Sequence, residues 1–522
     1  NLPERHRSLR AVFSSSAQLL GDQGREAFQR LSVFRGGFDR QAAERVASAS
    51  LPLLLDLVNK SLIAKAASSR FVMHEMLRQF ASELLAENDP KNSAIRNRHS
   101  RYYLEFVAQR GEDLRGDRQQ QALEAIHPEM GNIRSAWNWA VERRHWGRVD
   151  QSLESIYRFC LLTSRILEVG EIFSSALESL TKQEEPRLWA RTVARQGRFF
   201  ILLGRFEEAR RLLEECLEVF RHLEEHHEIA FTLSNLGEIC FHRGEFEQAR
   251  EMSEESAGRF RALDDRIGTA NAMNLRGRIA GARGDYEESR RLFNQSLVIY
   301  QDVGAQDGIA RCLTNLGNLA IISQTYLEAI RMFQEGLEIY TRLGDRKGMA
   351  FCLNNLGVVF EESSQREKAR DFQQRALALF REVGYQDATA RSLENLGRIT
   401  FSLGEYRKSG QYFSQALRTA SAIQAVPTVL MALMGLARLL DQKGRKEKAW
   451  QLLQFITAHP KSDSEARVQA RELIQSLQTS LPAEVREAVG APRPEEDLEA
   501  LAREVLADLN LGSVATLDTR SA

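Results

Sequence analysis

The segment Cys312-Leu-Thr-Asn-Leu-Gly-Asn-Leu-Ala320 returns forty residues later as Cys352-Leu-Asn-Asn-Leu-Gly-Val-Val-Phe360. Its Asn-Leu-Gly core also occurs, in the same phase, at Asn235–Gly237 and Asn395–Gly397. Leu275-Arg-Gly277 occupies an intermediate slot with the same spacing. A fixed period of this length is typical of repeat architectures, in which each unit packs mainly on its neighbours.

Further anchors keep the same period and indicate helices. A glycine follows the first anchor by seven residues at Gly204, Gly244, Gly284, Gly404 and Gly444, with Gln324 and Ser364 as departures. A small residue stands five positions later, and an aromatic residue closes many units: Phe220, Phe260, Tyr300, Tyr340 and Phe380. Apolar residues recur at three- and four-residue spacing, which is typical of a helix stripe and not of strand alternation.

We therefore predict that residues 187–460 form seven helical hairpins of forty residues, stacked in an all-α solenoid. A single hairpin cannot bury its apolar face alone. A bundle or coiled coil would need heptads without regular glycine punctuation. The pattern resembles tetratricopeptide repeats, in the longer variety found in kinesin light chains and bacterial signalling ATPases. This resemblance implies a right-handed superhelix whose concave groove is lined by the first helix of each hairpin.

The rest of the chain divides into three parts. In residues 1–90 the pattern of apolar residues predicts three helices followed by two short extended runs, Ser61–Ala64 and Arg70–Met73. Three helices followed by such a hairpin are typical of a winged helix. Residues 91–186 read as a helical connector with degenerate hairpins. Residues 461–522 predict capping helices near 464–479 and 494–509, separated by Ala491-Pro-Arg-Pro494 and followed by a frayed tail from Gly512.

Composition excludes several classes of protein. Lys and Arg number 71 against 71 Asp and Glu, so a bulk polycation that coats nucleic acid is excluded. No apolar run approaches the ~18 residues of a membrane helix, and no signal peptide is visible. The chain contains five cysteines and no CxxC pair, which favours reduced core thiols in a cytoplasmic protein. Because the chain starts at Asn1 inside a motif, we interpret it as the C-terminal part of a longer protein.

Several strings outside the repeats resemble STAND regulators, the signal-transduction ATPases with numerous domains of the NB-ARC type, including bacterial regulators. The strings are Leu2–Arg10, Phe28–Phe38, Asn59–Ile63 and Glu129-Met-Gly-Asn-Ile-Arg-Ser-Ala-Trp137. Met73-His74-Glu75 resembles the Met-His-Asp motif of that family. The resemblance implies that His74 contacts the β-phosphate of ADP in an upstream domain. The alternative is that His74 only caps the following helix.

The chain itself is expected to be non-catalytic. It contains no GxxxxGK[ST] loop to hold phosphates, so ADP or ATP is expected only in a full-length parent and no cofactor in this chain. Arg78 stands where a zinc protease would need its second histidine after His74, and no metal site is predicted. His226-His227 is expected in an exposed loop between repeats.

Two sets of polar side chains predict a binding groove. Equivalent or adjacent slots hold Asn235, Asn274, Asn315, Asn354, Asn355 and Asn395. Amides of this kind grip an extended peptide backbone, or alternatively tie neighbouring helices together. Two further slots hold Arg191, Arg311 and Arg391, and Arg198, Arg278 and Arg398. Arginine suits a carboxylate or phosphate, whereas a solvated surface is the alternative, as for Arg195, Arg210, Arg250 and Arg290.

The sequence therefore predicts the sensing and regulatory half of a STAND-type switch. Its partners would be a peptide or protein in the groove, or an anionic small ligand, together with an upstream nucleotide-binding domain. One alternative is a simple interaction scaffold. The other is a DNA-binding regulator that uses the winged helix, although residues 1–50 carry only eight Arg against five acidic residues, a weak excess for duplex binding.

Overall fold

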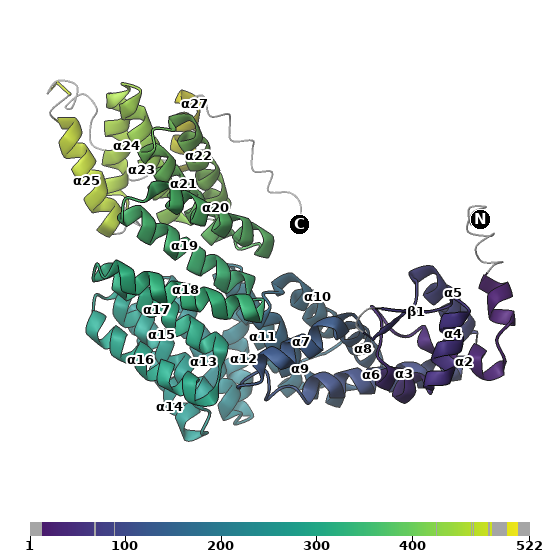
Figure 1. Cartoon of the computed structure of the whole chain (residues 1–522). Helices are drawn as coiled ribbons and strands as arrows, with labels where there is room; N and C mark the ends of the chain where they lie inside the picture. Colours follow the sequence, from purple (N-terminus) through teal and green to yellow (C-terminus); the bar gives the residue numbers. More distant parts are fainter. Residues whose placement is uncertain are drawn as a thin grey trace.

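The computed structural model describes residues 13–66, 69–87, 89–423, 425–460, 462, 464–478, 481–482 and 498–509. Within these residues the regular structure is helical, apart from one two-stranded hairpin and one isolated bridge. Figure 1 shows helical hairpins stacked in chain order towards the C-terminus, with the N-terminal helices at the opposite end of an elongated molecule. The predicted all-α solenoid is confirmed.

In the described part of the N-terminal module, a helical segment at residues 13–18 is followed by three helices, a hairpin and a further helix. These are α2 (Asp22–Leu31), α3 (Arg40–Ala47), α4 (Leu51–Asn59), β1 (Ala64–Lys65), β2 (Phe71–Val72) and α5 (Glu75–Ala86). β1 and β2 pair antiparallel, and a bridge between Phe38 and Phe71 adds a third extended segment. Phe28, Phe38 and Phe80 are buried in the core of this module. The string Leu2–Arg10 lies outside the described residues.

The connector is a run of helices that continues the chain into the solenoid. It contains α6 (Asp89–Ala108), α7 (Gln119–Ile126), η1 (His127–Glu129), α8 (Met130–Glu142), α9 (Trp146–Leu162) and α10 (Ile166–Leu177). Ile133, Trp137 and Ala140 of α8 share one face and are fully buried. The indole of Trp137 donates a 3.0 Å hydrogen bond to the carbonyl of Ile172, so α8 and α10 are joined as well as packed.

Seven helical hairpins follow without interruption. They are α11 (Pro186–Leu202) with α12 (Phe206–His222), α13 (His226–His242) with α14 (Phe246–Ala262), α15 (Arg266–Ala282) with α16 (Tyr286–Val303), α17 (Gln306–Ile322) with α18 (Tyr326–Leu343), α19 (Arg346–Glu362) with α20 (Arg366–Val383), α21 (Gln386–Ser402) with α22 (Tyr406–Ala422), and α23 (Val426–Gln442) with α24 (Lys446–Ala458). The helices of each hairpin pack on one another and on the next hairpin.

The periodic glycines serve close packing and sharp turns. A Cβ atom added to Gly277 would lie 2.6 Å from the ring of Phe293, and one added to Gly317 would lie 2.6 Å from Phe333. A side chain at either position would push the two helices of its hairpin apart. The turn residue Gly244 has φ +78°, in the left-handed region that glycine adopts at no steric cost. The departure Gln324 adopts the same conformation, with φ 58°, without being glycine.

The remaining core positions follow the repeat. The closing aromatics Phe260, Tyr300 and Tyr340 are buried, and Tyr340 lies against Gly348 in the first turn of the next hairpin. All five cysteines are buried and free. Cys160 and Cys216 belong to apolar clusters as small core residues. The other three thiols also have polar neighbours: Cys240 accepts from Arg210, Cys312 accepts from the amide of Asn274, and Cys352 lies 3.5 Å from the hydroxyl of Thr314.

The C-terminal end of the solenoid is covered by α25 (Ser464–Gln478) and contacted by α27 (Leu498–Asp508). Ala470 and Leu477 of α25 and Leu506 of α27 belong to the same apolar core as Leu453 of the last hairpin. The segments Ala491–Pro494 and Gly512–Ala522 lie outside the described residues. Among the described residues, no helix combines the length and apolar character needed to cross a membrane.

Candidate functional site in the inner wall of the solenoid

The first helices of successive hairpins surround a cavity of about 580 Å³. Its wall is formed by side chains of α11, α13, α15, α17, α19 and α21, and by Tyr157, Leu161 and Leu162 of α9 in the connector. The closing aromatics Phe260, Tyr340 and Phe380 of the second helices also reach it. This volume lies within the ~300–1,000 Å³ range of small-ligand sites. The lining is mixed, because aromatic rings such as Phe231 and Phe351 alternate with amides and charged groups. A cavity of this composition suits a short peptide or a small ligand with both apolar and polar parts.

The asparagines of the predicted ladder line the cavity and also hold the helices together. Asn235, Asn274, Asn315, Asn354 and Asn355 are wall residues. The amide of Asn315 donates to Asn274 Oδ1 at 3.1 Å, and that of Asn355 donates to Asn318 Oδ1 at 2.9 Å. An asparagine at one of these positions can therefore both tie neighbouring helices together and face a ligand in the cavity. Asn395 does not line the cavity, and its amide donates to Asn354 Oδ1 at 3.3 Å.

Only some of the arginines in the two predicted slots line the cavity. Arg198, Arg278, Arg311 and Arg391 line the cavity, but Arg191 and Arg398 do not. The expectation that every member of both slots faces the groove is wrong for these two residues. Arg191 is bound by Asp150 and Glu228 at the covered end of the solenoid, and Arg398 forms a 2.9 Å ion pair with Glu361. Carboxylates of neighbouring helices thus hold both guanidinium groups in ion pairs that belong to the packing of the helices.

Glu238 is the central carboxylate of the cavity. It forms an ion pair with Arg198 and another with Arg278, the latter at 3.3 Å. Burial alone would raise the pKa of Glu238, but Arg198, then His242 and Arg278, hold it well below its usual value. Glu238 is therefore ionised and its charge is already shared by two guanidinium groups.

Lys347 on α19 is a wall residue that the sequence analysis did not single out. Its Nζ lies 5.2 Å from the ring centroid of Tyr385 and 5.8 Å from that of Phe351. Burial, with a smaller contribution from the nearby Arg198 and against the opposing effect of Glu238, lowers the pKa of Lys347 to about 8. Over the described part of the chain, ion pairs within 4 Å engage Arg198, Arg278 and Arg311 but neither Lys347 nor Arg391.

The connector closes over the same helices and touches three of their N-terminal ends. Arg115 forms a 2.6 Å ion pair with Asp265, which caps α15. The amide of Gln119 donates to Asp307 of α17 at 3.0 Å, and the hydroxyl of Ser164 donates to Asp345 at 2.6 Å. We call Arg115, Gln119 and Ser164 the connector latch. Because Asp307 and Asp345 also line the cavity, the latch borders the candidate site directly.

One of these contacts corrects a sequence expectation. His227 does not lie in an exposed loop: α13 begins at His226, and the Nε2 atom of His227 lies 3.1 Å from Asp265 Oδ2. Burial alone would raise the pKa of Asp265, but His227 and Arg115 hold it below its usual value. The carboxylate therefore links the second and third hairpins to the connector.

The N-terminal module is fastened to the connector by the segment that includes Glu129 and Asn132. Asn132 is 0% exposed; its Oδ1 accepts from the backbone N–H of Arg35 at 2.6 Å, and its amide donates to the carbonyl of Gly37 at 2.9 Å. Glu129 forms an ion pair with Arg70 beside the hairpin. Glu129 and Asn132 thus form the junction between the N-terminal module and the connector.

His74 lies at the surface of the N-terminal module. It is exposed, precedes α5, and its Nδ1 accepts a 3.4 Å hydrogen bond from the backbone N–H of Met76. Glu75 instead binds Arg78 through two hydrogen bonds of 2.8 and 2.5 Å. The capping role of His74 is thus present, and its ring is also accessible to a group outside the chain.

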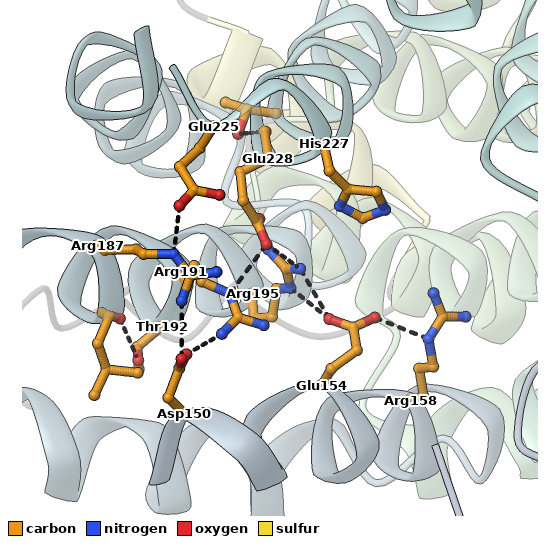
Figure 2. A network of polar contacts seen from close by, with 12 residues as sticks. Asp150, Glu154, Arg158, Arg187, Arg191, Thr192, Arg195, Glu225, His227 and Glu228 are labelled. Atoms are coloured by element: carbon orange, nitrogen blue, oxygen red, sulfur yellow. Dashed lines mark hydrogen bonds and ion pairs between the residues drawn. The ribbon is translucent and has the colours of Figure 1, made fainter. Parts of the chain in front are cut away.

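A buried arginine contradicts the expectation of a solvated surface. Arg195 is 1% exposed, and Figure 2 shows its guanidinium group between Glu154 and Glu228. It donates to Glu154 Oε2 at 2.8 Å and to Glu228 Oε1 at 3.0 Å. The sequence carries a signal for this pair: Arg195 stands in the slot that holds Asn235 and Asn315 in later hairpins, and Glu228 stands where Gly268 and Gly308 stand.

Comparison with known proteins supports the repeat. A family model described as tetratricopeptide repeat matches residues 189–262, 228–302 and 308–382, so the chain contains tetratricopeptide repeats. No curated protein matches the sequence.

Three of the solved structures that resemble the chain illustrate the likeness. A STAND protein with a tetratricopeptide repeat sensor from Pyrococcus horikoshii is 14% identical, covers 92% of this chain and 67% of its own, and has a TM-score of 0.51. BtubC from P. vanneervenii is 20% identical over 42% of this chain and 92% of its own, with a TM-score of 0.35. A Rap protein complexed with Competence and Sporulation Factor is 14% identical over 71% and 92%, with a TM-score of 0.43. The first likeness agrees with the α-solenoid fold.

Proposed function

We propose that this chain is the non-catalytic sensor of a STAND-type switch, in which the inner cavity receives a peptide or a segment of a protein. The cavity supplies amide donors and acceptors for an extended backbone and aromatic rings for side chains. The solved structure of a STAND protein with a tetratricopeptide repeat sensor, which has the same fold over most of this chain, agrees with such a role.

One observation carries this proposal: the cavity and the connector share residues. Asp307 and Asp345 line the cavity and are bound by Gln119 and Ser164 of the latch. A ligand that moves the N-terminal ends of α17 and α19 therefore changes the geometry of the latch. A ligand shifts a conformational equilibrium only through a difference in its affinity for the two states. In this proposal that difference arises at Asp307 and Asp345.

The N-terminal module is the output of the sensor in this proposal. Movement of the connector is transmitted to it through Asn132 and Glu129, which join the two parts. The module is a winged helix, and its exposed His74 contacts the β-phosphate of ADP in a nucleotide-binding domain supplied by a longer parent protein or by another chain. Histidine donates a hydrogen bond to phosphate in either protonation state.

Hydrogen exchange tests the coupling between cavity and connector. Immobilised chain would first select a peptide from a randomised mixture of N-acetylated octapeptides. Exchange would then be measured with and without the selected peptide. We expect slower exchange in α13–α21 together with altered exchange in residues 109–126 and 163–166. Protection confined to the solenoid would instead support a simple interaction scaffold.

The nucleotide role is tested separately, in a protein that joins this chain to its nucleotide-binding domain. His74→Ala should shorten ADP retention and raise basal activity. His226→Ala is a matched control, because His226 is also exposed but lies at the start of α13. Equal ADP retention in the two variants would remove His74 from the proposal.

A further inference from the structure

Two short strings of the connector, both outside the cavity, are rich in arginine. Arg96-Asn-Arg-His-Ser-Arg101 lies on α6, and Arg143-Arg-His-Trp-Gly-Arg148 spans the turn between α8 and α9. Each string contains three arginines and one histidine, and neither contains Asp or Glu. Because α6 packs against both α8 and α9, the two strings lie on neighbouring elements.

The indole ring of Trp139 brings one arginine of each string together. The Cζ atoms of Arg96 and Arg143 lie 5.2 and 4.7 Å from its ring centroid. The ring is fixed in turn, because its N–H donates a 3.0 Å hydrogen bond to Asn97 Oδ1. Cation–π contacts with a fixed ring orient the two guanidinium groups without neutralising their charge.

Arg101 and Arg148 form a second pair beside the first. Burial, and then the nearby Arg101, lower the pKa of Arg148 against the opposing effect of Glu105. The Nη1 atom of Arg148 lies 3.3 Å from His145 Nδ1, and burial, Arg148 and Arg143 lower the pKa of His145. Both shifts indicate a positive potential at this surface. We define the connector patch as Arg96, Arg101, Arg143 and Arg148.

The charges of the connector patch are not neutralised by ion pairs. Over the described residues, ion pairs within 4 Å engage the connector arginines Arg134 and Arg144 but none of the four arginines of the patch. Glu105 is close to Arg148, and Glu142 precedes Arg143 in the chain. The patch therefore keeps a surplus of two positive charges, which attracts an anionic partner.

The surroundings of the patch distinguish between classes of anionic partner. Protein interfaces bury an apolar core and membrane-surface helices bury an apolar face, whereas nucleic-acid interfaces are polar and positively charged. Arginine also matches the geometry of phosphate oxygens. Apart from the small residues Ala94 and Gly147, the exposed positions described in α6 and in residues 142–147 are polar: Lys91, Arg98, Arg101, Glu105, Glu142, Arg143 and Arg144.

We propose that the connector patch binds the phosphate backbone of a nucleic acid without reading its base sequence. The ring of Trp139 is buried and its N–H is engaged, so it orients arginines instead of stacking on a base. The inference goes beyond the proposed function, because none of the four arginines lines the cavity.

Fluorescence anisotropy of the full chain tests the proposal with a short labelled single strand and with the corresponding duplex, both of randomised sequence. Four phosphate contacts predict that the logarithm of the association constant falls with the logarithm of the salt concentration with a slope of about −3.6 for duplex. Raising the salt from about 50 to about 200 mM should therefore weaken duplex binding about 150-fold, and single-strand binding about 50-fold if the single strand is the preferred form.

Variants then assign the binding to the patch. Arg101→Gln combined with Arg148→Gln should reduce the salt slope by about half and weaken binding at low salt about tenfold or more. Arg134→Gln combined with Arg144→Gln is the matched control, because it removes the same charge from exposed connector positions that pair with Glu171 and Glu184. A melting curve verifies that each variant folds, and Arg101→Gln alone, at an exposed position, should reduce the slope by about one quarter.

Three results would overturn the proposal. One is the absence of binding to both forms at low salt. Another is equal binding by the patch variant and its control, which would place the contact elsewhere, for example on the N-terminal module. The third is competition by polyglutamate as strong as that by unlabelled strand, or equally strong capture by vesicles of phosphatidylcholine and phosphatidylserine, which would indicate a general anion surface. Peptide binding in the cavity is measured separately and is unaffected by these results.

Discussion

Ser164 donates a 2.6 Å hydrogen bond from its hydroxyl to the carboxylate of Asp345, a residue 181 positions later in the chain. The same hydroxyl accepts from the backbone N–H of Lys347 at 3.2 Å. Ser164 lies in the turn between α9 and α10, and Asp345 caps α19. A single connector residue therefore holds the first turn of a helix that lines the cavity.

Ser164→Ala should weaken this attachment without unfolding the protein. The loss of a partly buried hydrogen bond to a charged group costs about 1–3 kcal/mol, which acts first on local opening of the α19 N-terminus. We expect faster hydrogen exchange at the Lys347 amide. Ser175→Ala is a suitable comparison, because Ser175 bonds only to the carbonyl of Ile172 in its own helix. Unchanged exchange at Lys347 would show that the Ser164 contact does not hold the helix.

Lys347→Met should raise stability while it weakens binding. Burial lowers the pKa of Lys347 to about 8 from 10.5, with Arg198 and Arg278 lowering it and Glu238 and Asp345 raising it. The folded state therefore binds a proton less readily than the unfolded chain. Stability is lost as the pH falls from about 10.5 towards 8, and the loss persists at neutral pH.

Thermal unfolding at pH 7.5 and pH 10 measures this effect. The free energy of unfolding of the methionine variant should exceed that of the parent by about 1–2 kcal/mol at pH 7.5, after allowance for solvent in the cavity. This difference should be smaller at pH 10. Functional sites often contain groups that reduce stability, so greater stability with weaker binding would support a ligand role. A variant less stable than the parent at pH 7.5 would assign Lys347 to the framework.

The pair formed by Arg195 and Glu228 should tolerate joint replacement better than single replacement. Burial alone would raise the pKa of Glu228, but Arg195 holds it below its usual value, so both groups are charged in the interior. Arg195→Asn leaves Glu228 with Arg191 alone and is expected to cost about 3–5 kcal/mol. The double variant Arg195→Asn, Glu228→Gly restores the residues of later hairpins and should recover most of that loss.

Urea denaturation of the single and double variants measures the coupling between the two positions. Arg250→Asn provides a control, since Arg250 is an exposed arginine on α14 with partners within its own helix. Additive effects of the two replacements would mean that the buried pair does not act as a unit.

The repeats were predictable because their signal is periodic and local. The spacing of Gly277 and Gly317 reports close approach of two helices of the same hairpin, and this contact is repeated often enough to be read without coordinates. The turns at Gln324 and Ser364 show that the surrounding hairpin imposes a left-handed conformation even where the glycine is lost. The repeat slot also identified four cavity arginines, among them Arg311.

The closure of the cavity was not predictable from the same pattern. Arg115 and Ser164 lie in non-repeating turns, and their partners Asp265 and Asp345 are far away in sequence. Lys347 was missed because its slot is variable, with Asp307 and Asp387 in the neighbouring repeats. Such contacts depend on how far the solenoid curves, which is a property of the whole stack.

The junction between module and connector should be sensitive to acid. His99 is buried, its Nε2 lies 3.4 Å from Asn132 Oδ1, and burial lowers the pKa of His99 to about 4. The histidine is neutral when folded at neutral pH. Its contribution to stability is complete above about pH 6.5 and is lost as the pH falls towards 4, because the unfolded chain takes up the proton first.

Urea unfolding at pH 7.5 and pH 4.5 would compare the parent with His99→Gln, which keeps a donor for Asn132. Between these pH values the free energy of unfolding of the parent should fall by about 2–3 kcal/mol more than that of the variant. His226→Gln removes an exposed histidine and should follow the parent. Parallel losses in the parent and His99→Gln would mean that His99 does not destabilise the folded junction in acid, and that other groups, such as the carboxylates of the latch, account for the pH dependence.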